Sequence, residues 1–333
     1  MRVPEEVLKC VGFVGEVAYI DPITQEISGD LFGTGFFVAV RPEHPRLRKT
    51  SMSIVFFVTA KHLVEDMAKK QVPAYFRVNK TGGGSMTLTP HAGTVWYLHP
   101  TDKTADVAVI PIGYKPGVDI RAVALEQFAT SDVLQRMDIG IGNEVFATGL
   151  FQPPGGGDHG QPIVRHGNIA MMPTEQIETE YGYADVYLVE ARSIGGLSGS
   201  PVFVRPTICL PLPENATGLK YAFCNGHGAT LLGLMHGHWS IKESELNSPV
   251  INQQKTKGVN LGVGIVVPAM KILETIQRPE IGEFRRQIEE STLQKGIPGM
   301  DSAKQEPKQE PEKELFTKEQ FEAALRKATR KTK

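Results

Sequence analysis

The sequence contains few cysteines and no long apolar run. Among its 333 residues there are 3 cysteines (Cys10, Cys209 and Cys224), an odd number and too few for a disulfide framework, which favours a reducing compartment. No stretch approaches the ~18–20 consecutive apolar residues of a membrane span. Glu5 and Glu6 interrupt the segment that a signal peptide would keep apolar. We therefore expect a cytoplasmic protein without a signal peptide or transmembrane segment.

The chain also lacks a strong excess of either charge. Its formal net charge of −1 at pH 7 provides no general attraction to nucleic acid or to membranes, so neither is an expected partner. With 41% hydrophobic and 22% charged residues, the chain can bury a substantial core. This composition excludes a wholly disordered protein.

What the sequence does contain is a series of short apolar runs separated by Gly, Pro, Asn and Asp. The runs are rich in Val, Ile, Phe and Tyr and most have the length of a strand, whereas helical periodicity is confined to residues 60–70 and 268–277. This pattern predicts an all-β fold. The runs are GTGFFVAV (33–40), SIVFFVTA (53–60), ADVAVIPI (105–112), NEVFATGLF (143–151), ADVYLVEA (184–191), SPVFV (200–204), ATLLGLMHG (229–237) and VNLGVGIVVP (259–268).

The composition changes after about residue 280. The stretch AKQEPKQEPEKE (303–314) repeats KQEP and is almost wholly polar, which indicates an extended, solvated linker. Thr317 and Gln320 have the spacing of a capping box, so we expect a short helix at about 318–330. We interpret 279–333 as a charged linker and a short C-terminal helix. Its basic end either stays solvated or serves as a protein-interaction segment for an acidic partner.

The stretch GGLSGSPVF (195–203) raises the question of what Ser198 does. A serine hydroxyl is a weak nucleophile unless an imidazole takes its proton and a carboxylate orients that imidazole. His62 lies where an apolar run ends and a helical turn begins, and Asp106 lies at the start of an alternating strand. Asp102, four residues earlier, is the alternative carboxylate. The other interpretation is a serine in a small-residue turn and an ordinary surface histidine.

Taken in chain order, GTGFFV, VTAKH, ADVAVI, GLSGSPVF, LLGLMHG and GVGIVVP resemble the motifs of chymotrypsin-like (trypsin-like) serine peptidases. The resemblance is greatest to the bacterial branch that includes the HtrA proteases, here without their PDZ domains, and it covers roughly residues 10–270. It implies a peptidase domain at 1–278 made of two six-stranded antiparallel β-barrels, at about 10–115 and 135–270. The active site would lie in the cleft between the barrels.

The resemblance also implies roles for individual residues. Ser198 would be the nucleophile, His62 the general base and then acid, and Asp106 the residue that orients His62. The backbone N–H groups of Gly196 and Ser198 would form the oxyanion hole. The implied function is a serine endopeptidase that hydrolyses a polypeptide substrate through an acyl-enzyme, with no cofactor. The alternative is a catalytically idle trypsin-like domain that serves as a protein-binding module.

Three further residues are candidates for the substrate pocket: Arg192, His236 and His238. Arg192 would place a cation near the pocket floor and favour an acidic substrate side chain; the alternative is an Arg192 that faces solvent. His236 and His238 are spaced to share one face of a strand. Together with His227 they raise the question of a metal, but no cysteine or carboxylate completes a zinc pattern, so we predict no metal site.

The residue before the candidate nucleophile departs from the digestive branch of the family. Those relatives carry an Asp there, which pairs with the new N-terminal amine after zymogen cleavage, whereas this chain has Leu197. Because leucine cannot form an ion pair, we expect no activation by N-terminal cleavage. Ser200 stands where many relatives have glycine, and we expect it to be structural.

Overall fold

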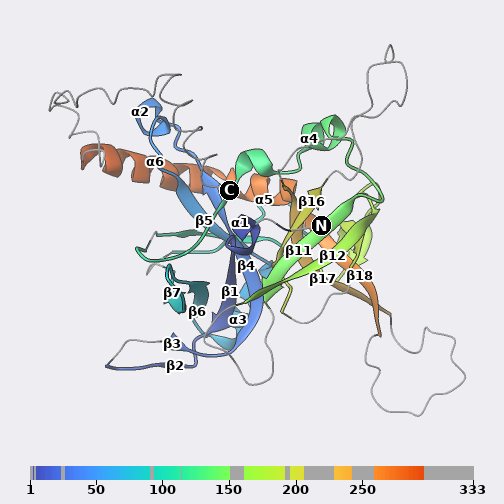
Figure 1. Ribbon diagram of the computed structural model, residues 1–333, viewed down its shortest axis with the longest axis horizontal. Helices are drawn as coiled ribbons and strands as arrows, with labels where there is room; N and C mark the ends of the chain where they lie inside the picture. The colour runs from blue at the N-terminus through green and yellow to red at the C-terminus, as the bar shows by residue number, and fades with distance from the viewer. Residues whose placement is uncertain are drawn as a thin grey trace, which may run out of the picture. The chain divides into compact units, whose positions relative to one another are not determined.

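The computed structural model describes residues 3, 5–23, 27–90, 94–113, 115–150, 161–191, 196–205, 229–241 and 259–295. Within these ranges the chain is mostly β with a few helices, which confirms the predicted class (Figure 1). None of the helices described here has the length and apolarity that crossing a bilayer requires. Arg192, His227, the KQEP stretch at 303–314 and the expected C-terminal helix at about 318–330 lie outside the described residues. The expected linker was wrong at its start, because residues 279–294 form helix α6.

The strands of the first half form one sheet, drawn in blue to teal in Figure 1. They are β1 (Val11–Glu16), β4 (Leu31–Val40), β5 (Ile54–Thr59), β6 (Ala74–Asn79), β7 (Ser85–Leu88), β8 (Tyr97–Leu98), β9 (Ala108–Ile112) and β10 (Val123–Ala124). The pairing order is β7-β6-β1-β4-β5-β9-β8, and β10 pairs with β4 in parallel. A separate hairpin consists of β2 (Tyr19–Ile20) and β3 (Ile27–Ser28).

The second half forms a closed barrel of six antiparallel strands. In pairing order these are β11 (Glu144–Leu150), β12 (Pro162–Met171), β15 (Tyr187–Glu190), β18 (Val259–Pro268), β17 (Thr230–Ile241) and β16 (Pro201–Arg205). A small sheet of β13 (Ile177–Thr179) and β14 (Gly182–Ala184) lies between β12 and β15 in the chain. The second predicted barrel is thus present. In the first half, the described strands give an eight-stranded sheet whose pairing path ends at β7 and β8 without closing.

The helices are short except for the last. They are α1 (Glu5–Leu8), α2 (Pro45–Arg48), α3 (Lys61–Lys70), α4 (Ser131–Arg136), α5 (Ala269–Ile276) and α6 (Pro279–Gln294), with a 3-10 turn η1 (Leu125–Gln127). The helical periodicities at 60–70 and 268–277 correspond to α3 and α5. The sequence did not predict α6, whose Ile281 is fully buried in the core. Its Glu289 carboxylate accepts the backbone N–H groups of Glu43 and His44, at 2.9 and 2.8 Å.

One apolar core is shared by the two halves of the fold. Phe36 and Phe56 of the first sheet, Phe146 and Phe203 of the barrel and Ile272 of α5 belong to the same buried cluster. The rings of Phe146 and Phe203 stack with centroids 5.4 Å apart. Burial of each such side chain stabilises the fold by about 1.5–3 kcal/mol. Because this core joins both halves, it holds the candidate residues from each half near one another.

Candidate active site

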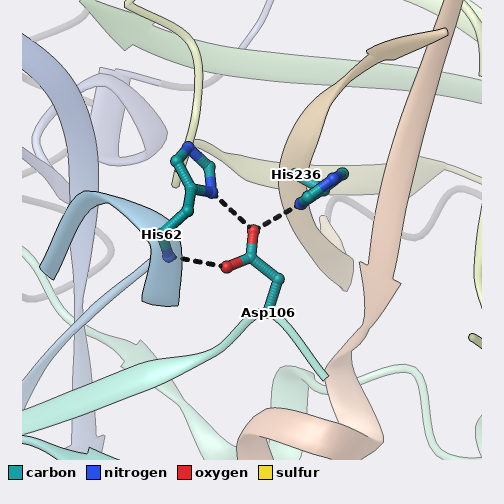
Figure 2. A group of neighbouring side chains, drawn as sticks. All are labelled: His62, Asp106 and His236. Carbon is teal, nitrogen blue, oxygen red and sulfur yellow. Dashed lines mark hydrogen bonds and ion pairs between the residues drawn. The ribbon is translucent and has the colours of Figure 1, made fainter. Parts of the chain in front are cut away.

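Asp106 lies two residues before the start of β9, and its side chain is only 2% exposed. Its two oxygens contact the same residue: Oδ1 accepts the backbone N–H of His62 at 2.9 Å, and Oδ2 lies 2.8 Å from His62 Nδ1 (Figure 2). An ionised carboxylate can only accept, so His62 must donate from Nδ1–H. This fixes the tautomer that leaves the Nε2 lone pair available to take a proton.

His62 is the second residue of α3, which begins directly after β5. The first N–H groups of a helix have no partner within the helix. The N-cap residue Ala60 has no side chain that can bond to them. Asp106 Oδ1 therefore satisfies one of these groups while Oδ2 holds the imidazole. The local sequence, an apolar strand followed by a helix start, places His62 at the end of the sheet beside Asp106.

The pKa values of this pair move in opposite directions. Burial alone would raise the pKa of Asp106, but the hydrogen bonds from His236 and His62 outweigh it and hold this pKa well below its usual range. For His62, burial lowers the pKa, but the hydrogen bond and the charge of Asp106 outweigh it and raise the pKa above 6.5. Near neutral pH Asp106 is therefore a charged acceptor, and its contact favours the protonated form of His62.

Ser198 is half-buried in a turn that requires glycine on both sides. Gly196 and Gly199 have φ of +91° and +81°, a region that other residues rarely adopt. A Cβ on Gly199 would lie 2.0 Å from the carbonyl oxygen of Thr34, so no side chain fits. The Ser198 hydroxyl donates to the carbonyl oxygen of His236 at 3.2 Å, its one hydrogen-bond partner among the described residues.

Thr34 of β4 holds this turn from the first half of the fold. Its backbone N–H donates to the Ser198 carbonyl oxygen at 2.9 Å. Its hydroxyl donates to the Gly196 carbonyl oxygen at 2.7 Å and accepts the N–H of Leu150 at 2.8 Å. The carbonyl groups of Gly196 and Ser198 are thus both engaged by Thr34, whereas the N–H groups of these two residues have no hydrogen-bond partner in the part of the chain that is described.

The neighbours of Ser198 in the turn are buried. Leu197 is 1% exposed and packs in the barrel core, where it fills apolar space. Ser200 is fully buried, and its hydroxyl oxygen has no hydrogen-bond partner among the described residues. Residues 192–195, including Arg192, lie outside the described residues.

His236 of β17 also binds Asp106, a contact that the sequence did not suggest. Its Nδ1 lies 2.5 Å from Asp106 Oδ2, the oxygen that His62 also contacts (Figure 2). The two imidazoles meet edge to face, with centroids 5.6 Å apart. His238, the other histidine of the pair, is exposed. Bulges between Met235 and Gly237 and after His238 interrupt the regular alternation of β17 and separate their environments.

The ligand atoms of His62, Asp106 and His236 all lie within 4.8 Å of one another. Imidazole and carboxylate are ligand types that zinc accepts. Here, however, each Nδ1 faces Oδ2 at a hydrogen-bond distance, so both ring nitrogens use their protons and offer no lone pair on that side. The contacts are those of two donors on one acceptor.

Asp102, the alternative carboxylate, is engaged elsewhere. Its Oδ2 lies 2.7 Å from Lys271 Nζ, and its Oδ1 accepts hydrogen bonds from Thr104. Burial raises its pKa, but these partners outweigh burial and lower it overall. The structure therefore brings Asp106, and not Asp102, against His62.

A hollow of about 590 Å³ opens beside the candidate residues. Its lining residues come from α3, from the turn at 196–200 (the serine turn), from β17 and β18, and from residues 178–180. The lining residues are His62, Ser198, His236, Gly237, His238, Trp239, Ile265, Glu178, Thr179 and Glu180. The sequence had not identified the two glutamates.

The turn between β13 and β14 is tied to α3. The Tyr181 hydroxyl donates to Glu65 at 2.9 Å, and the ammonium group of Lys61 lies 3.6 Å from the centre of the Tyr181 ring. Lys61 also donates to the carbonyl oxygen of Lys103 at 2.6 Å. A segment of the second half thus holds the helix that carries His62.

Comparison with known proteins found similarity in structure and not in sequence. The sequence matches no family model and no curated protein. The crystal structure of the MamO protease domain from Magnetospirillum magneticum (apo form) is similar over 82% of this chain and 98% of that chain, with 15% identity and a TM-score of 0.46. The crystal structure of Deg5 is similar over 81% of this chain and 88% of that one, with 12% identity and a TM-score of 0.42.

Proposed function

We propose that this chain is a serine endopeptidase that acts through an acyl-enzyme, with Ser198, His62 and Asp106 as its catalytic residues. The observation that carries the proposal is the pair of hydrogen bonds from His62 to the buried Asp106. These bonds set the imidazole tautomer that a general base needs. Ser198 and His62 line the same hollow, and the serine lies in a turn whose positive φ angles at Gly196 and Gly199 favour glycine.

The proposed reaction proceeds in two halves. His62 Nε2 takes the hydroxyl proton as Ser198 Oγ bonds to the carbonyl carbon of the substrate; it then gives that proton to the leaving amine as the C–N bond breaks. A water molecule attacks the resulting ester with the same proton exchange. This releases the carboxylic acid and restores the serine. Asp106 stays ionised and stabilises the imidazolium that forms in each half.

The unpaired N–H groups of Gly196 and Ser198 support an oxyanion hole. Donors aimed at the oxygen that becomes negative stabilise the transition state, and the loss of one such donor typically costs about 2.7–4 kcal/mol. Thr34 engages the carbonyl groups of the same two residues, which keeps the peptide planes of the turn in place. The turn is therefore arranged before substrate arrives.

One observation favours the alternative, an idle domain that binds protein. The Ser198 hydroxyl donates to the His236 carbonyl oxygen and not to His62. A working peptidase must rotate this hydroxyl toward Nε2 when substrate binds. Hydrogen bonds of catalytic groups often form fully only in the substrate complex. We therefore prefer the peptidase to the idle binding domain, and one reagent tests both functions.

The proposed substrate is a polypeptide that lies in the hollow lined by His236 and His238. Arg192 remains a proposed pocket residue from the sequence. A fluorophosphonate probe, which reacts only with an activated serine, is added to the full chain and to three variants. Ser198→Ala and His62→Ala are expected to abolish labelling while thermal unfolding stays cooperative. Ser200→Ala is the matched control, because this serine lies two residues along the same turn and its buried hydroxyl oxygen has no partner within the described ranges.

Labelling of the full chain and of Ser200→Ala, together with its loss in the other two variants, supports a peptidase. A full chain that folds but does not react with the probe contradicts catalysis and leaves the binding module. A screen of a peptide library with the labelled form then identifies which bonds are cleaved.

A further inference from the structure

Two imidazoles share a single oxygen at the candidate active site. His62 Nδ1 lies 2.8 Å and His236 Nδ1 2.5 Å from Asp106 Oδ2. The carboxylate is 2% exposed and the His236 side chain 11%, so little water reaches this contact. The general base needs only one of the two imidazoles. The other one, on β17, has no role in the proton transfers described above.

Because both imidazoles donate to Asp106 Oδ2, they share the negative charge of this one acceptor. A hydrogen bond to an ionised group is stronger than one between neutral groups, and it withdraws negative charge from the acceptor. The one hydrogen bond that His236 donates to Oδ2 therefore leaves less negative charge for the Nδ1–H of His62. The stabilisation of the imidazolium form of His62 depends on that charge.

Other charged and aromatic groups lie near the two imidazoles, but none of those described here accepts a hydrogen bond from both rings as Asp106 does. His62 feels the charges of Glu180 and of Asp66 on its own helix, both of which favour its protonated form. Glu180 Oε1 lies 3.9 Å from His236 Nε2, but its side chain is 59% exposed, so solvent screens it. The Tyr181 ring lies edge-on to His236, with centroids 6.3 Å apart. Asp106 is the one buried carboxylate among the described neighbours of both imidazoles.

We propose that His236 is a positioning residue of the proposed reaction: by donating Nδ1–H to Asp106 Oδ2 it orients the carboxylate and limits how strongly Asp106 favours protonated His62. This inference rests on the proposed function for its purpose, but not for its test. Its effect is to keep more His62 in the neutral, proton-accepting form at a given pH. A residue that only filled space beside Asp106 would have no such effect.

Two variants separate donation from packing. His236→Ala removes the donor. His236→Asn places an amide N–H at the δ position of the lost ring and keeps a donor that cannot titrate. His238→Ala is the matched control, because this histidine lines the same hollow, is exposed and makes no contact with Asp106 among the described interactions.

All variants are made in Ser198→Ala, so that no turnover is needed, and the chain is labelled with ¹⁵N-histidine. NMR then follows the titration of His62 and the downfield Nδ1 protons that carboxylate contacts produce. We expect two such protons in the parent and one in His236→Ala. We also expect the titration midpoint of His62 to rise by about one pH unit in His236→Ala. The midpoint should stay close to the parent in His236→Asn and in His238→Ala.

The inference is overturned if the midpoint does not rise in His236→Ala, or if His236→Asn behaves like His236→Ala. Should His236→Ala not fold, a single downfield proton in the parent chain overturns the inference and two support it. The probe experiment is read separately in the chain that retains Ser198. A failure to label with the expected midpoints would contradict the peptidase function and leave the role of His236 standing.

Discussion

Asp106 and His62 are joined through side chain and main chain at once. One carboxylate oxygen accepts the N–H that begins helix α3, and the other accepts the imidazole Nδ1–H. Neither residue can reorient without breaking a bond of the other. The helix start and the tautomer of the candidate base are therefore set by the same buried group.

The first prediction concerns the charge of Asp106. In Asp106→Asn the side chain keeps its shape, but one of its two oxygens becomes an NH₂ group. One of the two N–H donors of His62 then faces another donor and loses its acceptor. We expect the rate of fluorophosphonate labelling to fall by roughly 10³–10⁴-fold, because the imidazole is held in the wrong tautomer. We also expect a loss of ~1–3 kcal/mol in the free energy of unfolding. Labelling kinetics and denaturant unfolding measure the two effects.

Asp102→Asn is the matched control for that prediction. It weakens the ion pair with Lys271 and the hydrogen bonds from Thr104, so stability should fall. Labelling should stay within about threefold of the parent, since Asp102 does not contact His62 among the described residues. The reverse result, with labelling lost in Asp102→Asn and kept in Asp106→Asn, would show that Asp102 and not Asp106 orients His62.

The second prediction is a pH dependence with opposite signs for labelling and stability. Because the pKa of His62 is raised in the folded state, its contribution to stability is fully present below about pH 6.5 and is lost as pH rises through the folded pKa. Labelling needs neutral His62 and therefore rises over the same range. The pKa of Asp106 is depressed, so its contribution is lost only as pH falls below about 4.

The measurement compares the parent chain with His62→Ala in denaturant unfolding at several pH values. The difference in free energy of unfolding should be larger near pH 6 than near pH 9. A difference that grows with pH would show that the folded state lowers the pKa of His62 instead.

The third prediction concerns the hydrogen bonds by which Thr34 of β4 holds the turn around Ser198. Thr34→Val keeps the shape of the side chain but leaves the Leu150 N–H and the Gly196 carbonyl without a partner. Each unpaired buried group costs about 1–3 kcal/mol. We expect lower stability and slower labelling, because the serine turn loses its support. Thr34→Ser keeps the hydroxyl and should restore labelling.

Thr148→Val is the control for Thr34. Thr148 is a fully buried threonine of β11 whose hydroxyl oxygen has no hydrogen-bond partner in the described part of the chain. Its replacement by the isosteric valine should leave stability unchanged or raise it. If both variants had the same effect on the thermal midpoint, the cost would come from loss of a threonine in the core and not from the hydrogen bonds of Thr34.

The fourth prediction concerns α6. Glu289→Gln replaces a carboxylate that accepts two backbone N–H groups with an amide that presents its own N–H to one of them. We expect a loss of about 1–3 kcal/mol in the free energy of unfolding. Glu290→Gln, at the exposed neighbouring position, should change stability by less than about 0.5 kcal/mol. Equal losses of stability in both glutamine variants would contradict the role assigned to Glu289. A chain cut after Lys295, which retains α6, should keep the stability of the parent.

Strands with dense apolar runs were predictable from the sequence. The runs at 53–60, 143–151 and 259–268 correspond to β5, β11 and β18 within one or two residues. β12 was missed because most of its residues are only partly buried, which leaves it without an apolar run. α6 was missed because few of its positions face the core, so its periodicity is weak.

The candidate residues could be found, but their contacts could not. His62, Asp106 and Ser198 stand in motifs whose local pattern marks the end of a strand or a turn. The second imidazole on Asp106 is different, because His236 lies 130 positions away in the chain and its direction depends on a bulge in β17. The side chain of a histidine on a strand can point to either face of the sheet. Only the assembled fold decides which group it meets.

The bond between Thr34 and the serine turn has a consequence for a chain that is still being made. The two partners are 162 positions apart, and β4 leaves the ribosome long before residues 196–198 are translated. His62 and Asp106 also precede the serine. Under the proposed function, a nascent chain would carry His62 and Thr34 before it carries Ser198. It would gain peptidase activity only once residues 196–198 had been translated and had bonded to Thr34.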